Sequence, residues 1–196
     1  MNTRYPRWAA VAATALLLSG CAGGTPNSDS AALPAPASQG AGVNTSAGSS
    51  TSTAEVPPAA AMICSDEVKD NVQKILGLGS KPATTQSWDG SVFSCNYTLP
   101  EGNLQLSVQV FEGLKKAQAG AKDLASKVSA NPIVGLANLG LPGYQSPIGQ
   151  VVFAKDSMSL HVDATKMKEV VGPDAIPRTD FAYQIATTIL GCWTHG

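Results

Sequence analysis

Residues 91–99 and 104–110, near the middle of the chain, alternate between apolar and polar residues, a pattern typical of half-buried strands. Residues 84–88 precede them as the first arm of a predicted hairpin. Asp89-Gly90 separates this arm from residues 91–99, and this pair suits a tight hairpin turn because it tolerates positive φ angles. The core-facing positions of the second arm are Phe93, Cys95, Tyr97 and Leu99. The pattern therefore predicts an antiparallel meander of three strands.

A second hairpin is predicted for residues 150–154 and 157–164, with its turn at Lys155-Asp156. One face of its second strand is apolar and carries Met158, Leu160, Val162 and Ala164. The opposite face is polar and carries Ser157, Ser159, His161 and Asp163. The two hairpin regions together predict about five strands.

Helical spacing of apolar residues predicts helices over residues 65–76, over 112–129, and from Thr179 or Asp180 to Leu190. Ser65 is suited to cap the first helix, which Gly77 is expected to end. A short turn or helix is expected over residues 165–171. Residues 131–147 are rich in Gly and Pro without a clean period, and they predict a long apolar loop, a kind of segment that is often functional.

The order α-β-β-β-α-β-β-α lacks the strand-helix-strand series that builds a parallel sheet. It predicts an α+β fold, in which one antiparallel sheet of about five strands carries helices on one face.

The N-terminus has the pattern of an export signal. Arg4 and Arg7 precede an uncharged run at residues 8–18, which is too short to span a bilayer core of about 30 Å. Residues 1–20 are therefore expected to be a cleaved signal peptide. Leu18-Ser19-Gly20-Cys21 resembles the bacterial lipobox, which implies that Cys21 is lipidated and becomes the first residue of the mature protein. Several acyl chains on one cysteine would anchor the protein to the extracytoplasmic face of the cell membrane.

Residues 21–61 are dominated by Ala, Gly, Ser, Thr and Pro, and their only charges are Asp29 and Glu55. This composition predicts a disordered tether with a root-mean-square span of roughly 35 Å. Residues 62–196 are long enough for a single domain with its own core.

The charge of that domain is balanced. The chain has 13 Lys and Arg and 14 Asp and Glu, and outside residues 62–196 there are only Arg4, Arg7, Asp29 and Glu55. Eleven basic and twelve acidic residues therefore remain in the domain. This balance argues against nucleic acid as a partner and provides no basic cluster for anionic lipids.

Besides Cys21, the chain contains Cys64, Cys95 and Cys192. An oxidising compartment favours disulfides, and an odd number of thiols leaves one outside any bond within the chain. Pairing of Cys64 with Cys95, or of Cys192 with one of them, fits the residues equally well. None of the cysteine spacings matches a zinc site, and we expect neither a metal nor another cofactor.

Ser159, His161 and Asp163 are the residue types of a hydrolase triad, which makes an envelope hydrolase one alternative. Their spacing argues against it, because alternate positions on a strand place side chains about 7 Å apart whereas a triad needs contacts of about 3 Å. We interpret them as a solvated polar face and expect no enzymatic activity. Residues 76–81 suggest a helix stop rather than a phosphate loop, Trp88 and Trp193 suggest packing, and His195 is too close to the chain end for catalysis.

Four segments carry a resemblance to a known family: Cys64-Ser65-Asp66-Glu67-Val68, Ile75-Leu76-Gly77, Cys95-Asn96-Tyr97 and residues 104–111. In this arrangement the chain resembles the actinobacterial cell-envelope lipoproteins of the DUF3558 type. The resemblance implies a lipobox, a linker, one α+β domain and a disulfide between Cys64 and Cys95. Tyr97 stands where a Trp is usual, and Cys192 lies outside the family pattern. These lipoproteins resemble the extracellular sensor domains of some receptor kinases, and the resemblance supplies no reaction.

The leading hypothesis is a membrane-anchored, non-enzymatic domain that binds a ligand or an envelope protein, as a sensor would. The alternative is a carrier of a lipid or another apolar ligand between sheet and helices, with residues 131–147 as a lid.

Overall fold

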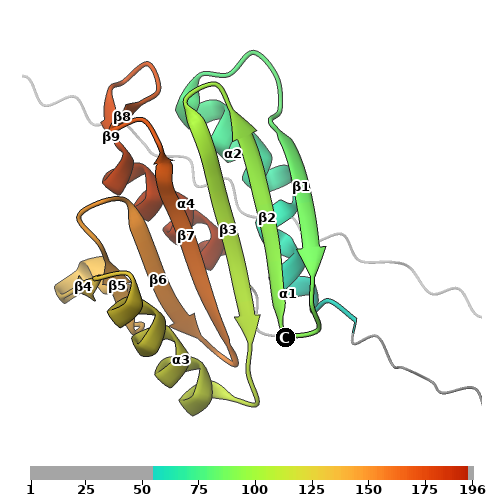
Figure 1. The fold of residues 1–196 in the computed structure, drawn as a ribbon, viewed down its shortest axis with the longest axis vertical. Coiled ribbons are helices and arrows are strands. Elements are labelled where there is room, and N and C mark those ends of the chain that lie inside the picture. The colour runs from blue at the N-terminus through green and yellow to red at the C-terminus, as the bar shows by residue number, and fades with distance from the viewer. Residues whose placement is uncertain (1–54, 194–196) are drawn as a thin grey trace, which may run out of the picture. The chain divides into compact units, whose positions relative to one another are not determined.

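The computed structural model of this chain describes residues 55–193. The signal peptide predicted at residues 1–20, the proposed lipidation site Cys21, most of the predicted tether and His195 lie outside the described residues. Within the described part, the chain folds as an α+β domain built on one antiparallel sheet, as the sequence predicts (Figure 1).

The main sheet has seven strands in the order β1-β2-β3-β7-β6-β5-β4, and every neighbouring pair is antiparallel. The strands are β1 Ala83–Trp88, β2 Val92–Leu99, β3 Gly102–Val110, β4 Asn131–Pro132, β5 Gly143–Gln145, β6 Gln150–Lys155 and β7 Met158–Met167. Two short strands, β8 Val170–Val171 and β9 Ile176–Pro177, form a separate ribbon.

The four α-helices of the described part are α1 Pro58–Ala61, α2 Asp66–Leu76, α3 Leu114–Lys127 and α4 Arg178–Cys192. Two 3₁₀ turns cover Met62–Cys64 and Gly135–Asn138. The predicted boundaries of α2 are confirmed, because the Ser65 side chain accepts from the Val68 N–H and Gly77 ends the helix with a φ of 63°. Across residues 55–193, no helix combines the length and apolar character needed to cross a membrane.

The predicted number of strands is too low. Residues 131–147, expected to be a loop, contain the short strands β4 and β5 around a 3₁₀ turn. These strands are too short to show an alternating pattern in the sequence. Residues 165–171 were expected to form a turn or helix, but β7 continues through Met167 and β8 follows at Val170.

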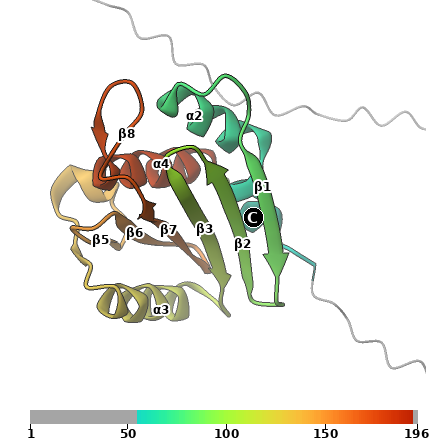
Figure 2. The same ribbon diagram turned by 45° about the horizontal axis from the view of Figure 1, so that its top comes forward.

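Helices cover both faces of the sheet, so the prediction of helices on one face is wrong. Figure 2 shows the sheet between α3 on one side and α2 and α4 on the other. The reason lies in β6, whose residues 151–154 are all buried. Val151 and Phe153 belong to the main core, whereas Val152 and Ala154 pack with Ala121 of α3. A strand that is apolar on both faces needs a covering layer on each.

The main core lies between the sheet and helices α2 and α4. It is built from the alternate residues of β2, β3 and β7 that the sequence pattern assigns to the core, together with the apolar side of α4. Its largest fully buried side chains are Tyr97, Phe153 and Phe181.

The ordered domain begins earlier than residue 62. Residues 58–61, expected to end the tether, form α1, and Ala60 is completely buried. Alanine has too small a side chain to signal a core position by size, which explains why composition assigned this segment to the tether.

A disulfide joins Cys64 to Cys95 with a Cα–Cα distance of 5.6 Å, which is the pairing that the family resemblance implies. It ties the segment before α2 to β2. The hydroxyl of Tyr97, two residues after Cys95 on β2, donates to the carbonyl of Ile63, the residue before Cys64. Burial raises the pKa of Tyr97. Cys192 is outside the disulfide and contacts the first turn of α2, with its Sγ 3.1 Å from Glu67 Oε1.

We expect loss of the disulfide to destabilise the domain strongly. The bond closes a loop with a sequence separation of 31, for which chain entropy gives roughly 3.5 kcal/mol. Cys64→Ala/Cys95→Ala should therefore lower the free energy of unfolding in urea by about 3–4 kcal/mol. Cys192→Ser is the matched control and should change it by less than about 1 kcal/mol. Equal losses in both proteins would contradict this account.

Candidate functional site

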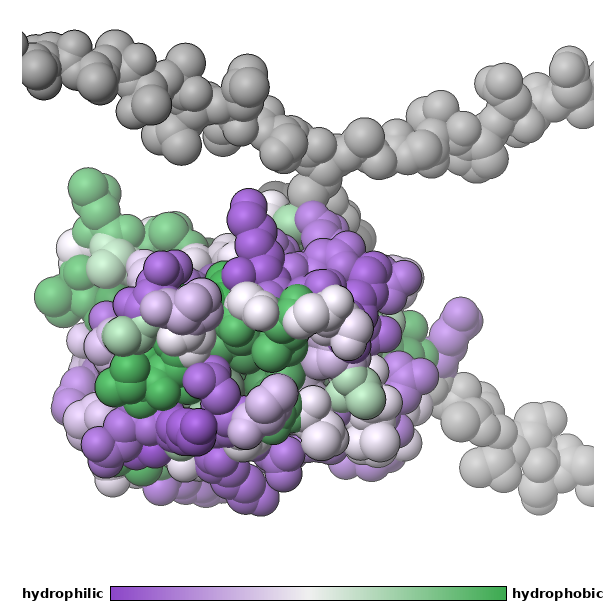
Figure 3. Space-filling model, turned by 90° about the horizontal axis from the view of Figure 1, so that it is seen from above, coloured by the Kyte–Doolittle hydropathy of each residue, from purple (hydrophilic) through white to green (hydrophobic). Residues whose placement is uncertain are grey.

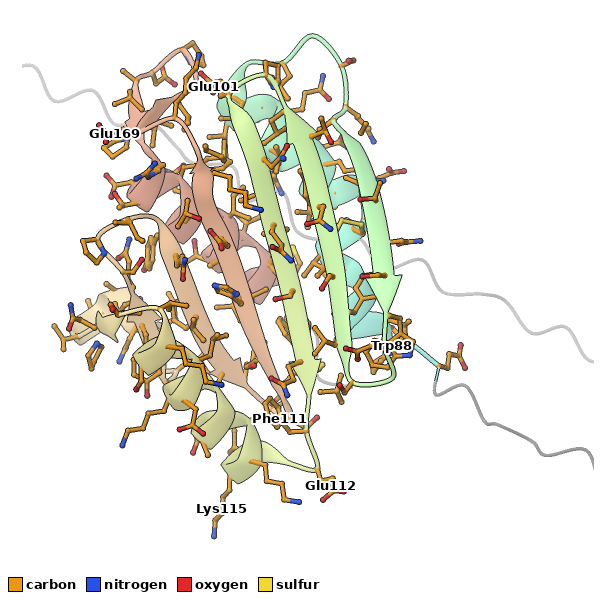
Figure 4. All side chains as sticks on the ribbon, in the orientation of Figure 1. Trp88, Glu101, Phe111, Glu112, Lys115 and Glu169 are labelled. Carbon is orange, nitrogen blue, oxygen red and sulfur yellow. A yellow bond between two sulfur atoms is a disulfide. The ribbon has the colours of Figure 1, made fainter. Side chains whose placement is uncertain are left out.

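One face of the sheet is open to solvent over β1, β2, β3 and the part of β7 that follows the half-buried His161. Helix α3 packs on this face only over β5, β6 and part of β7 (Figure 1). Figure 4 shows nitrogen and oxygen atoms along β2, β3 and β7 on the side that faces the viewer. We call this surface the polar face, and its residues are Thr85, Ser87, Ser94, Asn96, Thr98, Asn103, Gln105, Ser107, Gln109, His161, Asp163 and Lys166.

Strand pairing aligns these side chains in rows across the sheet. Thr85, Asn96, Gln105 and Asp163 are successive partners on β1, β2, β3 and β7, and Thr98, Asn103 and Lys166 form the next row. Between these rows lies a hollow of about 240 Å³, which we call the polar hollow. It is lined by Thr85, Asn96, Tyr97, Thr98, Asn103, Gln105, Asp163 and Lys166.

A β-bulge in β7 brings Lys166 to the polar hollow. Asn103 pairs with Lys166 and Gln105 with Asp163, so β7 has one residue more than β3 over this stretch. In a regular strand Lys166 would point away from Asp163, toward the core. The extra residue reverses this alternation and places both charged residues on one face.

Asp163 stabilises the bulge through its own side chain. Its Oδ1 accepts from the Thr165 N–H at 2.8 Å and from the Thr165 hydroxyl at 2.6 Å. Gly102 allows β3 to approach the far end of the bulge, because a Cβ there would lie 2.1 Å from the Lys166 carbonyl oxygen. After the bulge, Met167 returns to the core.

The chemistry of the polar hollow is mixed and nearly neutral. The three amides of Asn96, Asn103 and Gln105 each offer both donors and acceptors, and the two threonines add hydroxyl groups. Asp163 and Lys166 contribute one charge of each sign. Such a lining is suited to a ligand that presents many hydrogen-bonding groups without a large net charge. Of these residues, only Asp163 is a candidate on sequence grounds.

Ser159, His161 and Asp163 share one face of β7, as predicted, but they do not form a hydrogen-bonded series. The Asp163 carboxylate is engaged with Thr165, and the buried His161 Nε2 has no hydrogen-bond partner among the described residues. The prediction of a solvated face is wrong for Ser159, which is only 2% exposed because it lies next to Ala154 on the side that α3 covers, and it holds only in part for His161, whose ring is half-buried. The signal for this cover lies on the neighbouring strand, where residues 151–154 are apolar without interruption.

The two candidate tryptophans contribute to packing, as predicted. Trp88, at the end of β1 in Figure 4, packs against the core, and Trp193 is 2% exposed with its carbonyl accepting from Lys155 Nζ.

The segment at residues 76–81 ends α2, as predicted. Lys81 returns to that helix and pairs with Asp70 at 2.9 Å, and this contact raises the pKa of Lys81.

The connection between β4 and β5 exposes apolar side chains. Val134, Leu136 and Leu139 are 78%, 97% and 49% exposed, and we call these three residues the apolar tip. Figure 3 shows hydrophobic surface gathered at the side of the domain where this connection lies. Two hollows of about 350 and 400 Å³ lie at the base of the connection and share Ile133 and Gln145 in their linings.

Among residues 55–193, no group of three His, Cys, Asp or Glu side chains is placed to hold a metal ion. Comparison of the chain with protein-family models, curated proteins and solved structures found no match. The site must therefore be interpreted from its own chemistry.

Burial of His161 should make stability depend on pH. Desolvation lowers the pKa of His161, and the nearby Asp163 charge opposes this shift only in part. The unfolded chain, whose histidines titrate near pH 6.5, then binds the proton more readily than the folded protein. We expect the free energy of unfolding to fall as the pH decreases below about 6.5, by at most about 1.4 kcal/mol per pH unit for this one group.

Urea denaturation of the wild type, His161→Gln and His195→Gln between pH 7.5 and 5.5 would test this expectation. The slope in this range should become smaller in His161→Gln and remain unchanged in His195→Gln. An unchanged slope in His161→Gln would show that other groups cause the acid sensitivity.

Proposed function

We propose that this protein is a lipid-anchored, non-enzymatic binding domain of the cell envelope, and that it recognises its ligand through the polar hollow. The observation that carries the proposal is the concentration of hydrogen-bonding side chains in a hollow on the part of the sheet face that α3 leaves uncovered. An open sheet face needs only polar residues to be soluble. Solubility does not require the bulge, which brings the carboxylate of Asp163 and the ammonium group of Lys166 to the same hollow.

The ligand class follows from the lining. Amide and hydroxyl groups in rows offer donors and acceptors to a polar molecule that carries both, such as a saccharide or a peptide. The pair Asp163 and Lys166 suits a ligand that is neutral overall. Because the charges of Asp163 and Lys166 offset each other, the hollow offers no net electrostatic attraction to a strongly anionic or a strongly cationic ligand.

The proposed location depends on the N-terminal sequence. The lipobox-like residues 18–21 support an anchor at Cys21 on the extracytoplasmic face of the membrane. The Cys64–Cys95 disulfide suits an oxidising compartment and supports the same location. The antiparallel α+β fold is also what the resemblance to DUF3558-type lipoproteins implies, so it supports that family assignment as a proposal.

An apolar-ligand carrier is the second candidate, and the hollows at residues 131–147 are the observation in its favour. The space between the sheet and α4 is filled by fully buried side chains such as Tyr97, Phe153 and Phe181. A carried lipid would therefore bind at the hollow of about 400 Å³ beside Tyr183 and Ile133, and not in the core. Lipid that copurifies in native mass spectrometry would favour this alternative.

The anchor is tested by the mass of the exported chain. A lipidated protein should begin at residue 21, carry the added mass of a diacylglyceryl group and partition into detergent. Cys21→Ser should abolish both the added mass and the partitioning, whereas Cys192→Ser should retain them. A wild-type chain that is cleaved elsewhere and stays in the aqueous phase would refute the anchor.

The polar hollow is tested by following side-chain amide resonances during titration with soluble cell-wall saccharides and peptides. A ligand should shift the resonances of Asn96, Asn103 and Gln105, and leave those of Gln109, which lies on the same face outside the hollow. Each of Asn96→Ala and Gln105→Ala should weaken binding about threefold to tenfold, the effect of one lost hydrogen bond. Gln109→Ala is the matched control, and equal effects in all three variants would place the site elsewhere.

A further inference from the structure

The apolar tip is held out from the domain by an ordered turn. Strands β4 and β5 pair at its base, where the Ile133 N–H also donates to the Gly143 carbonyl. The Tyr183 hydroxyl of α4 donates to the Ala137 carbonyl, which fixes the turn against the helix. Leu139 closes the 3₁₀ turn with a φ of 55°, a conformation that is costly for leucine. The structure thus fixes a turn whose apolar side chains point to solvent.

The same connection also contains apolar residues that are packed. Ile133 and Leu141, on either side of the tip, contact the main core. Exposure is therefore a property of the tip itself and does not extend along the whole connection. Of the six large hydrophobic residues found exposed in the described part of the chain, three lie within residues 134–139.

The connection that carries the tip has no charged residue of its own, although Asp180 of α4 lines the hollow at its base together with Ile133 and Ala137. The sequence between Lys127 and Lys155 contains no Asp, Glu, Lys or Arg. Ile148, in the turn between β5 and β6, is a further exposed apolar residue, and its neighbour Pro147 lines a hollow together with Ile133. The tip itself can therefore enter an apolar medium without removing a charge from water, which would be costly, provided that Asp180 at its base stays in water.

We propose that the apolar tip inserts into the membrane that holds the lipid anchor and thereby orients the domain on the bilayer. The three side chains stand on a protruding turn, and a stable protein partner would need about 800 Å² of complementary surface from each side. A fluid bilayer adapts to the inserted side chains and needs no complementary surface of fixed shape. Insertion of three residues is weak alone, but the predicted tether, with an expected span of roughly 35 Å, would keep the tip at a high effective concentration near the lipid.

This orientation would leave the polar hollow accessible. The tip lies at the β4 edge of the sheet, whereas the hollow lies on β1, β2, β3 and β7, toward the opposite edge. The inference rests on the lipid anchor of the proposed function, because the anchor supplies the nearby membrane.

Tryptophan fluorescence in vesicles tests the proposal. The full mature chain, lipidated and reconstituted into phosphatidylcholine vesicles with brominated acyl chains, would be compared as wild type, Leu136→Trp and Leu114→Trp. Leu114 is the matched control, because it is 49% exposed at the start of α3, away from the tip. We expect bromine to quench at least half of the added fluorescence in Leu136→Trp and almost none in Leu114→Trp.

Equal quenching in the two variants, or none in Leu136→Trp, would overturn the proposal, and the second result would direct attention to a protein partner. Flotation with the vesicles reports the anchor separately. If the chain does not float, the anchor is wrong, and the same comparison is then made with an N-terminally His-tagged chain held on vesicles by a nickel-chelating lipid. Selective quenching of Leu136→Trp there would still support insertion, and its absence would refute it.

Discussion

The pairing of β3 with β7 is the contact on which the rest of this structure depends. These strands join a meander near the start of the domain to a hairpin some fifty residues later, and they turn two small sheets into one. Their apolar faces form the centre of the core that α2 and α4 cover. Their polar faces meet on the other side, and the polar hollow lies where the bulge interrupts this pairing. One register therefore determines both the core and the candidate site.

Much of this fold follows from local patterns. Alternation in residues 91–99 and 104–110 predicts which side chains are buried, and Ser65 and Gly77 predict the ends of α2. What the local patterns lack is information on packing between distant elements. The uninterrupted apolar residues 151–154 are typical of a strand buried on both faces, and they were the available signal that α3 would cover the second face. Strands β4 and β5 had no such signal, because two or three residues cannot show a period.

The candidate site was harder to predict for the same reason. Asn96, Asn103 and Gln105 occupy outward positions that alternation identifies only as polar, and their convergence depends on the registers of three strands. Lys166 was beyond prediction from period alone, since regular alternation places it in the core and only the bulge brings it to Asp163. The cysteines show the opposite case. The odd number of cysteines besides Cys21 predicted one thiol outside any disulfide within the chain, and the family resemblance predicted the Cys64–Cys95 pair. The residues alone did not decide whether Cys192 would pair with Cys64 or Cys95.

The division of the surface has a physical logic. An apolar turn and a polar hollow cannot share one patch, because the medium that suits the first removes the hydrogen-bonding water that the second must exchange for a ligand. This domain separates them across the width of the sheet, with the tip beyond β4 and the hollow over β1 to β3 and β7. If the tip contacts the membrane, the sheet acts as a spacer that keeps the hollow in water. A flexible tether alone would not fix the distance between the polar hollow and the membrane. A second, weak contact at the β4 edge would restrict this distance.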